Sequence, residues 1–138
     1  MGDGGYRLED QVGHLMRRAQ QRHLVLFAGV IPELTTTQFA ALAKLAERGP
    51  LSQNQLGRAT AMDAATIKGV VGRLVTRGLV ATTPDVEDRR RLVIALTAEG
   101  RALHDRVVGQ ALEASRLTLE PLEPDERAAF LRLLRKLA

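Results

Sequence analysis

Residues 85–97 read DVEDRRRLVIALT, and this stretch decides the fold. Three acidic residues lead into three consecutive arginines, Arg89, Arg90 and Arg91, and an apolar run typical of a β-strand follows directly. A second β-type run, LVATTP, occupies residues 79–84, so residues 79–97 predict a β-hairpin with a long cationic tip. A bare cluster of positive charge contributes little to folding, which suggests that the tip meets a polyanion.

The segments before the hairpin have the period of α-helices. Residues 64–77 follow a natural N-cap, Asp63, end before Gly78, and repeat apolar side chains three and four residues apart. A short helix that Ser52 can cap precedes them, across a turn at residues 61–62. Ala61 stands in that turn, where many helix-turn-helix units have glycine. The order of helix, turn, helix and basic hairpin is the layout of a winged helix-turn-helix.

The whole chain of 138 residues suits a single domain that is mainly α-helical with one small β-hairpin. Aromatic residues make up only 3%, so aliphatic side chains must fill the core. We expect a long N-terminal helix over residues 6–31 and two further helices within residues 98–138. Residues 35–97 then form a DNA-binding lobe whose wing is residues 79–97, and the terminal helices, too apolar to stand alone, form a dimer interface.

The distribution of charge favours a nucleic acid as the partner. The formal net charge is +4, and residues 58–91 alone carry seven basic and four acidic residues, a net charge of +3. The chain has no cysteine, which excludes disulfides and thiolate chemistry. It also has no apolar run of the roughly 18 residues that span a bilayer and no apolar leader at its start. We therefore expect a cytoplasmic protein without a membrane partner.

The helix over residues 64–77 has an unusual outer face. The residues on this face are small, and they include Gly69 and Gly72. Each glycine lowers the stability of the helix by roughly 1 kcal/mol relative to alanine. One interpretation is close packing of a neighbouring helix; the other is entry of a narrow ridge into the DNA major groove. In the second case Lys68 reaches a guanine, Thr66 contacts a thymine methyl or a phosphate, and Arg73 contacts a phosphate.

The arginines of the hairpin tip fit the minor groove. An arginine at the end of a thin wing can enter a narrow A·T tract, where the negative potential is concentrated, and Arg90 is the best candidate. Asp85 and Asp88 can pair with an arginine or cap the turn, which stiffens the tip before DNA arrives. The alternative is a solvated charged loop.

These motifs carry a specific resemblance. Residues 85–103, DVEDRRRLVIALTAEGRAL, preceded by LVTRGLV at 74–80, resemble the wing and flanks of the MarR family of bacterial transcription regulators. Residues 34–80 are similar to the family's central helices. The matching positions of the wing are Asp85, Asp88, Arg89, Arg90, Leu96, Thr97, Glu99, Gly100 and Arg101. The resemblance implies a homodimer that reads a pseudo-palindrome in double-stranded DNA, commonly as a repressor that a small ligand releases.

Residues 15–23, LMRRAQQRH, resemble the first helix of family members that respond to aromatic carboxylates. The resemblance implies that Arg17 pairs with the carboxylate and that His23, six residues later, contacts the ligand. A guanidinium can hold a carboxylate bidentately, and an imidazole can bond to a ring hydroxyl or ring nitrogen. The alternatives are that His23 is a buried or interface histidine and that Arg18 or Arg22 forms interface salt bridges.

Other classes of function have less support. No glycine-rich phosphate loop, nucleophile elbow or His-Glu-x-x-His motif is present, so we expect no catalytic residues and no cofactor. His14, His23 and His104 lack close metal-ligand spacing, although His14 and His104 could meet acids across a dimer in a metal-sensing regulator. A DNA-binding regulator that needs no ligand is the remaining alternative.

Overall fold

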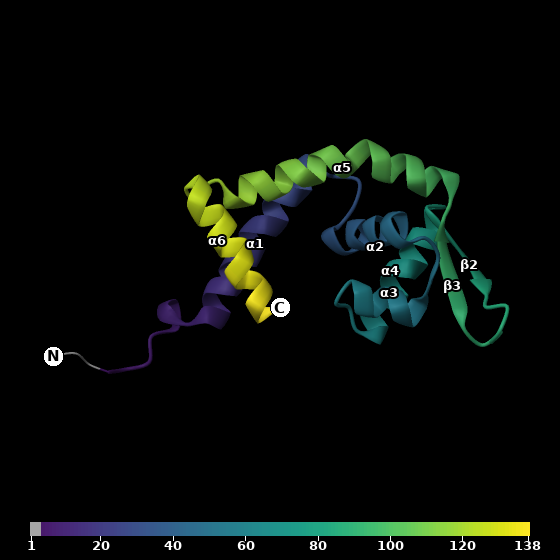
Figure 1. Cartoon of the computed structure of the whole chain (residues 1–138), viewed down its shortest axis with the longest axis horizontal. Helices are drawn as coiled ribbons and strands as arrows, with labels where there is room; N and C mark the ends of the chain where they lie inside the picture. The colour runs from purple at the N-terminus through teal and green to yellow at the C-terminus, as the bar shows by residue number, and fades with distance from the viewer. Residues whose placement is uncertain (1–3) are drawn as a thin grey trace. The chain divides into compact units, whose positions relative to one another are not determined.

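A computed structural model of the chain describes residues 4–138 (Figure 1). The chain forms two compact units: the N-terminal part as far as Val30 together with Gln110–Ala138, and Ile31–Gly109. The boundary between the units falls within a single helix, α5. The elements in chain order are η1 (Leu8–Asp10), α1 (Val12–Val30), α2 (Thr36–Arg48), β1 (Leu51–Ser52), α3 (Gln53–Ala59), α4 (Ala64–Thr76), β2 (Val80–Pro84), β3 (Leu92–Leu96), α5 (Ala98–Leu119) and α6 (Pro124–Leu137).

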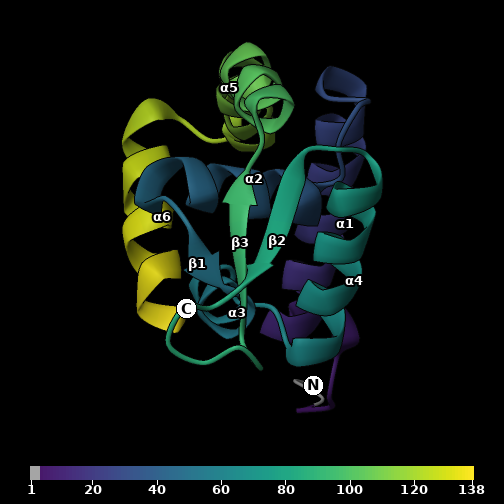
Figure 2. The ribbon, with the colours of Figure 1, turned by 90° about the vertical axis from the view of Figure 1, so that its right-hand side faces the viewer.

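The unit Ile31–Gly109 contains the predicted hairpin and one strand that the sequence did not indicate. β2 pairs with β3 in antiparallel register from Val80 opposite Leu96 to Pro84 opposite Leu92. β1 adds two residues to the other edge of β3, with Leu51 opposite Ile94, so the sheet order is β1-β3-β2 (Figure 2). The prediction of a mainly helical fold with a small sheet is confirmed, and the sheet has three strands rather than two.

Aliphatic side chains from the helices and from the two longer strands of this unit fill its core. The apolar side chains predicted to line one face of residues 64–77 are all buried. The central strand contributes Ile94, which is 0% exposed. Helices α3 and α4 begin at the predicted caps, and α2 begins at Thr35: the side chains of Thr35, Ser52 and Asp63 each accept a backbone N–H three residues later. Buried residues of this core include Ile31, Leu42, Leu45, Leu56, Ile67, Val70, Val71, Leu74, Leu79 and Val107.

One junction joins the end of α4, the start of β2 and the start of α5. Gly78 takes the left-handed conformation, with φ of 73°, that ends α4. The Thr97 hydroxyl donates to the Gly78 carbonyl at 2.6 Å and accepts the Gly100 N–H at 3.0 Å, while the Thr97 N–H donates to the Leu79 carbonyl at 3.1 Å. The Thr-x-Glu-Gly sequence therefore caps α5 and fastens it to the first strand of the wing.

The turn between α3 and α4 contains a strained residue. Ala61 has φ of 56°, in the left-handed region that costs a residue with a Cβ roughly 1–2 kcal/mol. This is the turn position at which glycine was expected from other helix-turn-helix units. The Met62 N–H donates to the Gly57 carbonyl at 2.9 Å, which closes the turn. The Ala61 N–H also donates to the Arg58 carbonyl at 3.3 Å, so the turn keeps its geometry without glycine through backbone hydrogen bonds around the exposed Ala61.

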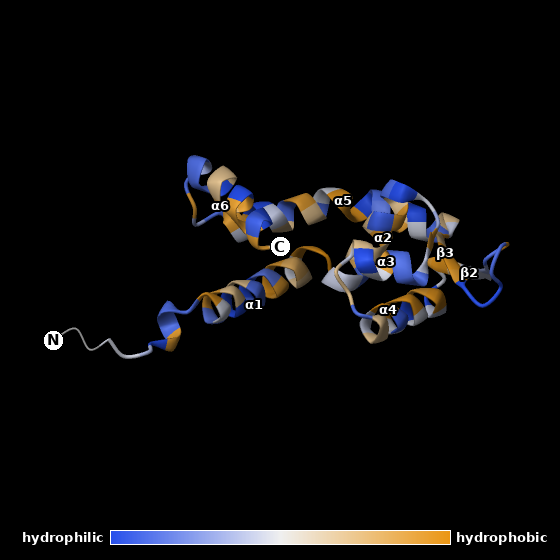
Figure 3. Ribbon diagram, turned by 60° about the horizontal axis from the view of Figure 1, so that its bottom comes forward, coloured by the Kyte–Doolittle hydropathy of each residue, from blue (hydrophilic) through white to orange (hydrophobic). Residues whose placement is uncertain are grey.

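In the other unit, the first helix begins later than predicted, and the unit has little core of its own. The expected helix over residues 6–31 is a short 3₁₀ turn followed by α1 from Val12, because Gln11 is extended. Among the residues that the structure describes here, only Phe27 and Ala114 are buried apolar side chains. The orange apolar positions of α1 and α6 in Figure 3 alternate with blue polar ones. The exposed large apolar residues include Leu8, Val12, Leu15, Met16, Leu24, Val25, Leu112, Phe130, Leu133 and Leu137.

Within residues 4–138, none of the helices combines the length and the apolar character that crossing a bilayer requires.

The junction at Thr97 makes Gly100 intolerant of any side chain. A Cβ added at Gly100 would overlap the backbone carbonyl of Leu79, whereas a Cβ at Gly109 in the same helix meets nothing within 4 Å. We expect Gly100→Ala to lower the free energy of unfolding by about 1–3 kcal/mol or more. Gly109→Ala should raise it by up to about 1 kcal/mol. Urea unfolding followed by circular dichroism measures both, and equal stability of the two variants would contradict the prediction.

Candidate functional site

Helix α4 presents a polar face to solvent beside its buried stripe. Thr66, Lys68 and Arg73 are exposed, and Gly69 is half-buried between them. The Asp63 carboxylate accepts the Thr66 N–H at 2.7 Å and so fixes the first turn of the helix. This backbone hydrogen bond from Thr66 also lowers the pKa of Asp63 below its ordinary value. The side chains predicted to contact DNA therefore project from a helix whose start is firmly capped.

The two glycines of α4 do not pack against another helix. A Cβ added at Gly72 would meet nothing within 4 Å, and one at Gly69 would meet only the guanidinium of Arg73, at 3.4 Å. Within the described part of the chain, close helix packing therefore does not explain why these positions are small. The face is narrow and open, with the Arg73 side chain lying across it.

The tip of the wing is ordered by its own acidic residues. The Asp85 carboxylate accepts the Glu87 N–H at 2.8 Å, and the backbone of Asp85 pairs with the carbonyl of Arg91 at 2.8 Å. The Asp88 carboxylate accepts both the backbone N–H of Arg90 at 3.1 Å and its Nε–H at 3.3 Å. The tip, mostly blue in Figure 3, is therefore a largely hydrophilic turn that the two aspartates hold.

The three arginines of the tip differ in their freedom. The Arg90 side chain is 94% exposed although its Nε is held by Asp88, and Arg91 lies 4.0 Å from Asp85. Arg89 is exposed and has no hydrogen bond or ion pair within residues 4–138. Guanidinium groups thus extend from a stiff turn into solvent.

Sequence reasoning missed Arg77, which positions α4. Its Nη1 donates to the Glu33 carbonyl at 2.7 Å and lies 3.4 Å from Gln38 Oε1, so it ties the end of α4 to the start of α2. The Glu33 carboxylate in turn pairs with Arg106 at 3.2 Å. The partners lie 44 residues apart along the chain, and no local pattern in the sequence indicates such a contact.

The unit of α1 and α6 contains a largely apolar cavity of about 400 Å³. His23 lines it together with residues of the last turns of α5 and of α6. The His23 Nδ1 lies 2.8 Å from the Thr118 hydroxyl, and the imidazole ring lies 6.1 Å from the Phe27 ring. A cavity of this volume is in the range of small-molecule sites. Its lining is Met16, Ala19, Gln20, His23, Ser115, Thr118, Leu119, Phe130, Leu131 and Leu134.

Arg17 does not line this cavity. Its side chain is exposed, and it makes no hydrogen bond or ion pair with the rest of residues 4–138. Six residues along an α-helix correspond to about 600° of rotation, so Arg17 and His23 leave α1 about 120° apart. The chain alone does not bring the two predicted ligand residues together.

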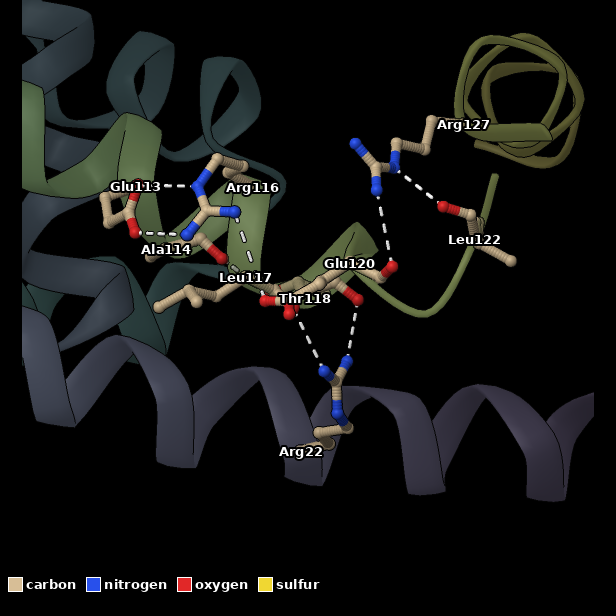
Figure 4. A network of polar contacts seen from close by, with 9 residues as sticks. All are labelled: Arg22, Glu113, Ala114, Arg116, Leu117, Thr118, Glu120, Leu122 and Arg127. Atoms are coloured by element: carbon tan, nitrogen blue, oxygen red, sulfur yellow. Dashed lines mark hydrogen bonds and ion pairs between the residues drawn. The ribbon is translucent and has the colours of Figure 1, made fainter. Parts of the chain in front are cut away.

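Arg22 has a role that the sequence did not reveal. Its guanidinium donates to the Thr118 carbonyl at 2.6 Å and to the Leu117 carbonyl at 3.0 Å, as Figure 4 shows. These carbonyls belong to the last turn of α5, where backbone N–H donors run out; the Leu117 carbonyl also accepts the Glu120 N–H at 3.3 Å. Arg22 therefore caps α5 from α1 within its own chain, next to the contact between His23 and Thr118.

The histidines considered for a metal site are occupied otherwise or isolated. His104 stacks on Phe39 with ring centroids 6.0 Å apart, and its Nδ1 lies 3.0 Å from the Asp105 carboxylate. In the part of the chain that is described, no three histidine, aspartate or glutamate side chains gather in a way that could hold a metal ion.

Comparisons with known proteins agree on one family. The model of the MarR family matches residues 33–91. The transcriptional repressor NicR of Pseudomonas putida is 46% identical to this chain over 134 residues, which cover 96% of the chain and 85% of that protein.

Two solved structures resemble the chain over nearly its full length. BpsR of Bordetella bronchiseptica, whose DNA binding is regulated by 6-hydroxynicotinic acid, is 43% identical with a TM-score of 0.92 and 96% coverage of both chains. PcaV of Streptomyces coelicolor, solved with its natural ligand, is 36% identical with a TM-score of 0.90, and the match covers 96% of this chain and 95% of PcaV. The chain belongs to the MarR family of DNA-binding transcriptional regulators and is not an enzyme.

Proposed function

We propose that this protein is a homodimeric repressor that binds a pseudo-palindromic operator and that a small aromatic acid releases it from DNA. The observation that carries the proposal is the combination, in one compact unit, of an open polar face on α4 and a cationic wing held by its own aspartates. The similarity to NicR, a transcriptional repressor, supports the same conclusion.

The polar face of α4 enters the major groove in this proposal. Lys68 and Thr66 contact base edges near the start of the helix, and Arg73 contacts a phosphate. Gly69 and Gly72 keep the ridge narrow, which is supported by the open space around them. The guanidinium of Arg73 already lies over Gly69, so a bulkier residue there would displace it.

The wing enters the adjacent minor groove. Arg90 is the residue that inserts, flanked by Arg89 and Arg91. Asp88 and Asp85 act on the turn rather than on DNA, since both accept backbone N–H groups of the tip. Residues 85–91 carry three acidic residues and three arginines, so net charge alone does not attract DNA to the tip. The placement of the charges does, since the Arg90 side chain is 94% exposed and that of Asp88 is 40% exposed.

The N-terminal and C-terminal helices supply the dimer interface. Residues 6–31 and 98–138 together expose many large apolar side chains and bury few, which is the expected state of an interface without its partner. A two-fold dimer spaces its two α4 helices by about one DNA turn, roughly 34–36 Å. Residues 35–97 then act as the DNA-reading lobe of a single functional domain that spans residues 1–138.

The effector binds at the cavity lined by His23. The DNA binding of BpsR is regulated by 6-hydroxynicotinic acid, which supports a small aromatic acid as the effector. PcaV was solved with a natural ligand, which supports a ligand-responsive regulator. His23 bonds to a polar group on the ring, and the free guanidinium of Arg17 pairs with the carboxylate when the dimer completes the site. The apolar wall formed by Met16, Leu131 and Leu134 covers the faces of the ring.

Substitutions on α4 should separate base reading from phosphate contact. Lys68→Ala should cost about 1–3 kcal/mol on the operator and relax the preference at one base pair. Arg73→Ala should weaken binding to all sequences and lower the slope of log K against log salt by about 1 for each subunit. Fluorescence anisotropy with DNA flanking the protein's own gene and with random DNA, at several salt concentrations, measures both.

The matched control for these variants is Arg116→Ala, which removes the same charge from a residue that pairs with Glu113 on α5. It should leave the affinity for DNA unchanged. An equal loss of affinity in this control would mean that total charge, rather than the face of α4, determines binding.

Gly72→Ala should improve folding and impair DNA binding together. The added methyl meets nothing in the chain, and alanine raises helix stability by roughly 1 kcal/mol over glycine. In the groove, the same methyl should collide with DNA and weaken binding about tenfold or more. Thermal unfolding and anisotropy are the two measurements. A variant that is more stable and binds normally would show that this face lies outside the groove.

The effector proposal is tested with a panel of aromatic acids in the same DNA-binding assay. We expect one acid to release the operator, and Arg17→Ala and His23→Ala to require at least tenfold more of it. Arg18→Ala, the neighbouring arginine, is the control. Release of both variants at the parent's acid concentration contradicts the assigned roles, and failure of every acid favours a ligand-independent regulator.

A further inference from the structure

The contact between His23 and Thr118 determines where the proton of the imidazole lies. The His23 Nδ1 is 2.8 Å from the Thr118 Oγ1, and that same Oγ1 is 2.8 Å from the carbonyl oxygen of Ala114. A hydroxyl has one proton to donate, and a carbonyl oxygen can only accept. Only one arrangement makes both contacts hydrogen bonds: Thr118 donates to Ala114 and accepts from His23.

The opposite arrangement is unfavourable. If the Thr118 hydroxyl donated to Nδ1, its oxygen would face the Ala114 oxygen at 2.8 Å with no proton between two acceptors. The neutral His23 side chain therefore carries its proton on Nδ1 and a lone pair on Nε2. The tautomer is set by a second residue rather than by the ligand.

The Thr118 hydroxyl is a fixed acceptor because its backbone is also held. Arg22, the residue before His23, donates to the carbonyls of Thr118 and Leu117 (Figure 4). Two consecutive residues of α1 thus contact Thr118 of α5: Arg22 binds its backbone carbonyl, and His23 binds its side-chain hydroxyl. This double contact holds Thr118 against His23 at both its backbone and its side chain.

The other nitrogen of His23 is left available. Within residues 4–138, the only hydrogen bond of His23 is the one at Nδ1, and no buried side-chain nitrogen or oxygen lacks a partner. Nε2 is therefore accessible. His23 is one of the residues that line the largely apolar cavity, so a ligand there that reaches Nε2 meets an acceptor and not a donor.

We propose that Thr118 is a positioning residue that fixes His23 as an Nε2 acceptor, so that the cavity selects aromatic acids whose ring carries a hydroxyl or an N–H. The proposal rests on the function proposed above and specifies its ligand. An acid without a ring donor leaves Nε2 unpaired in an apolar site, and it should bind about tenfold more weakly than its hydroxylated counterpart. An ionised carboxylate has no proton to donate to Nε2, so an aromatic acid without a ring hydroxyl or N–H is a poor effector.

The tautomer is measured first, without any ligand. ¹⁵N-histidine NMR of the dimeric protein at pH 8, where an ordinary histidine is neutral, distinguishes a protonated from an unprotonated ring nitrogen. The signals are assigned by replacing His14 and His104 in turn. We expect His23 to be protonated at Nδ1 in the parent and at Nε2 in Thr118→Val. His104, whose Nδ1 faces Asp105, is an internal control that should not change in Thr118→Val.

Selectivity is then measured in the same proteins by calorimetry and by release of operator DNA. The probes are two matched pairs: 6-hydroxynicotinate with nicotinate, and 4-hydroxybenzoate with benzoate. The parent should prefer the hydroxylated acid of a pair about tenfold, and Thr118→Val should lose most of that preference. Thr118→Ser keeps the hydroxyl and should restore both the tautomer and the preference. A merely structural role of Thr118 would change stability, which thermal unfolding records, without moving this ratio.

The possible results separate this proposal from the function on which it rests. Protonation of parent His23 at Nε2 overturns the proposal, whatever the ligands do. Protonation at Nδ1 with equal binding of both acids of each pair also overturns it, but leaves the aromatic-acid effector standing. If no acid of either pair binds the parent, the effector class is wrong and the proposed selectivity falls with it.

Discussion

The hydrogen bonds of Thr97 are the interaction on which the rest of the DNA-reading unit depends. A single residue donates to Gly78 and Leu79 and accepts from Gly100, so it joins the end of α4, the start of the wing and the start of α5. The absence of a side chain at Gly100 lets the backbone of α5 approach Leu79 closely enough for these bonds to form. If this junction opened, α4 and the wing would no longer hold a fixed position relative to each other. Binding of one to its groove would then not position the other.

The two functional surfaces are stiffened by different means. On α4, the Asp63 cap and the buried stripe fix the helix, while Arg77 anchors its end to Glu33. In the wing, where no core is available, Asp85 and Asp88 take over the unpaired N–H groups of the turn. Both arrangements order the backbone before DNA binds. Less conformational entropy is then lost on binding, and the basic side chains need less rearrangement.

Much of this architecture is predictable from local sequence, and the rest depends on distant contacts. The stripe of Ile67 and Val71, the caps at Ser52 and Asp63 and the hairpin follow from periodicity and side-chain chemistry within one turn or one strand. β1 is only two residues long and is a strand only because Leu51 meets Ile94. The start of α1 at Val12 was also not predicted, since the apolar pattern continues through residues that are not helical.

The same limit applies to the candidate sites. The exposure of Lys68 and Arg73 follows from helical spacing, whereas the contacts of Arg22 and His23 with Thr118 join residues 95 or 96 positions apart. The roles of the DNA and ligand residues remain predictions. The spacing of Arg17 and His23 matches a known motif, but helix geometry separates the two side chains within one chain, and it is only in the proposed function that a second subunit completes their site.

The sparse core of the unit formed by α1 and α6 has a consequence for the cell. The unit Ile31–Gly109 has its own dense core, but the unit that contains the cavity lined by His23 buries few apolar side chains by itself. If dimerisation completes that core, its stability rises with the concentration of the protein, by mass action. Dilution would then lower the stability of the unit formed by α1 and α6 before that of the unit Ile31–Gly109. The number of copies in the cell would thus determine how many molecules can respond to the effector as well as how many occupy the operator.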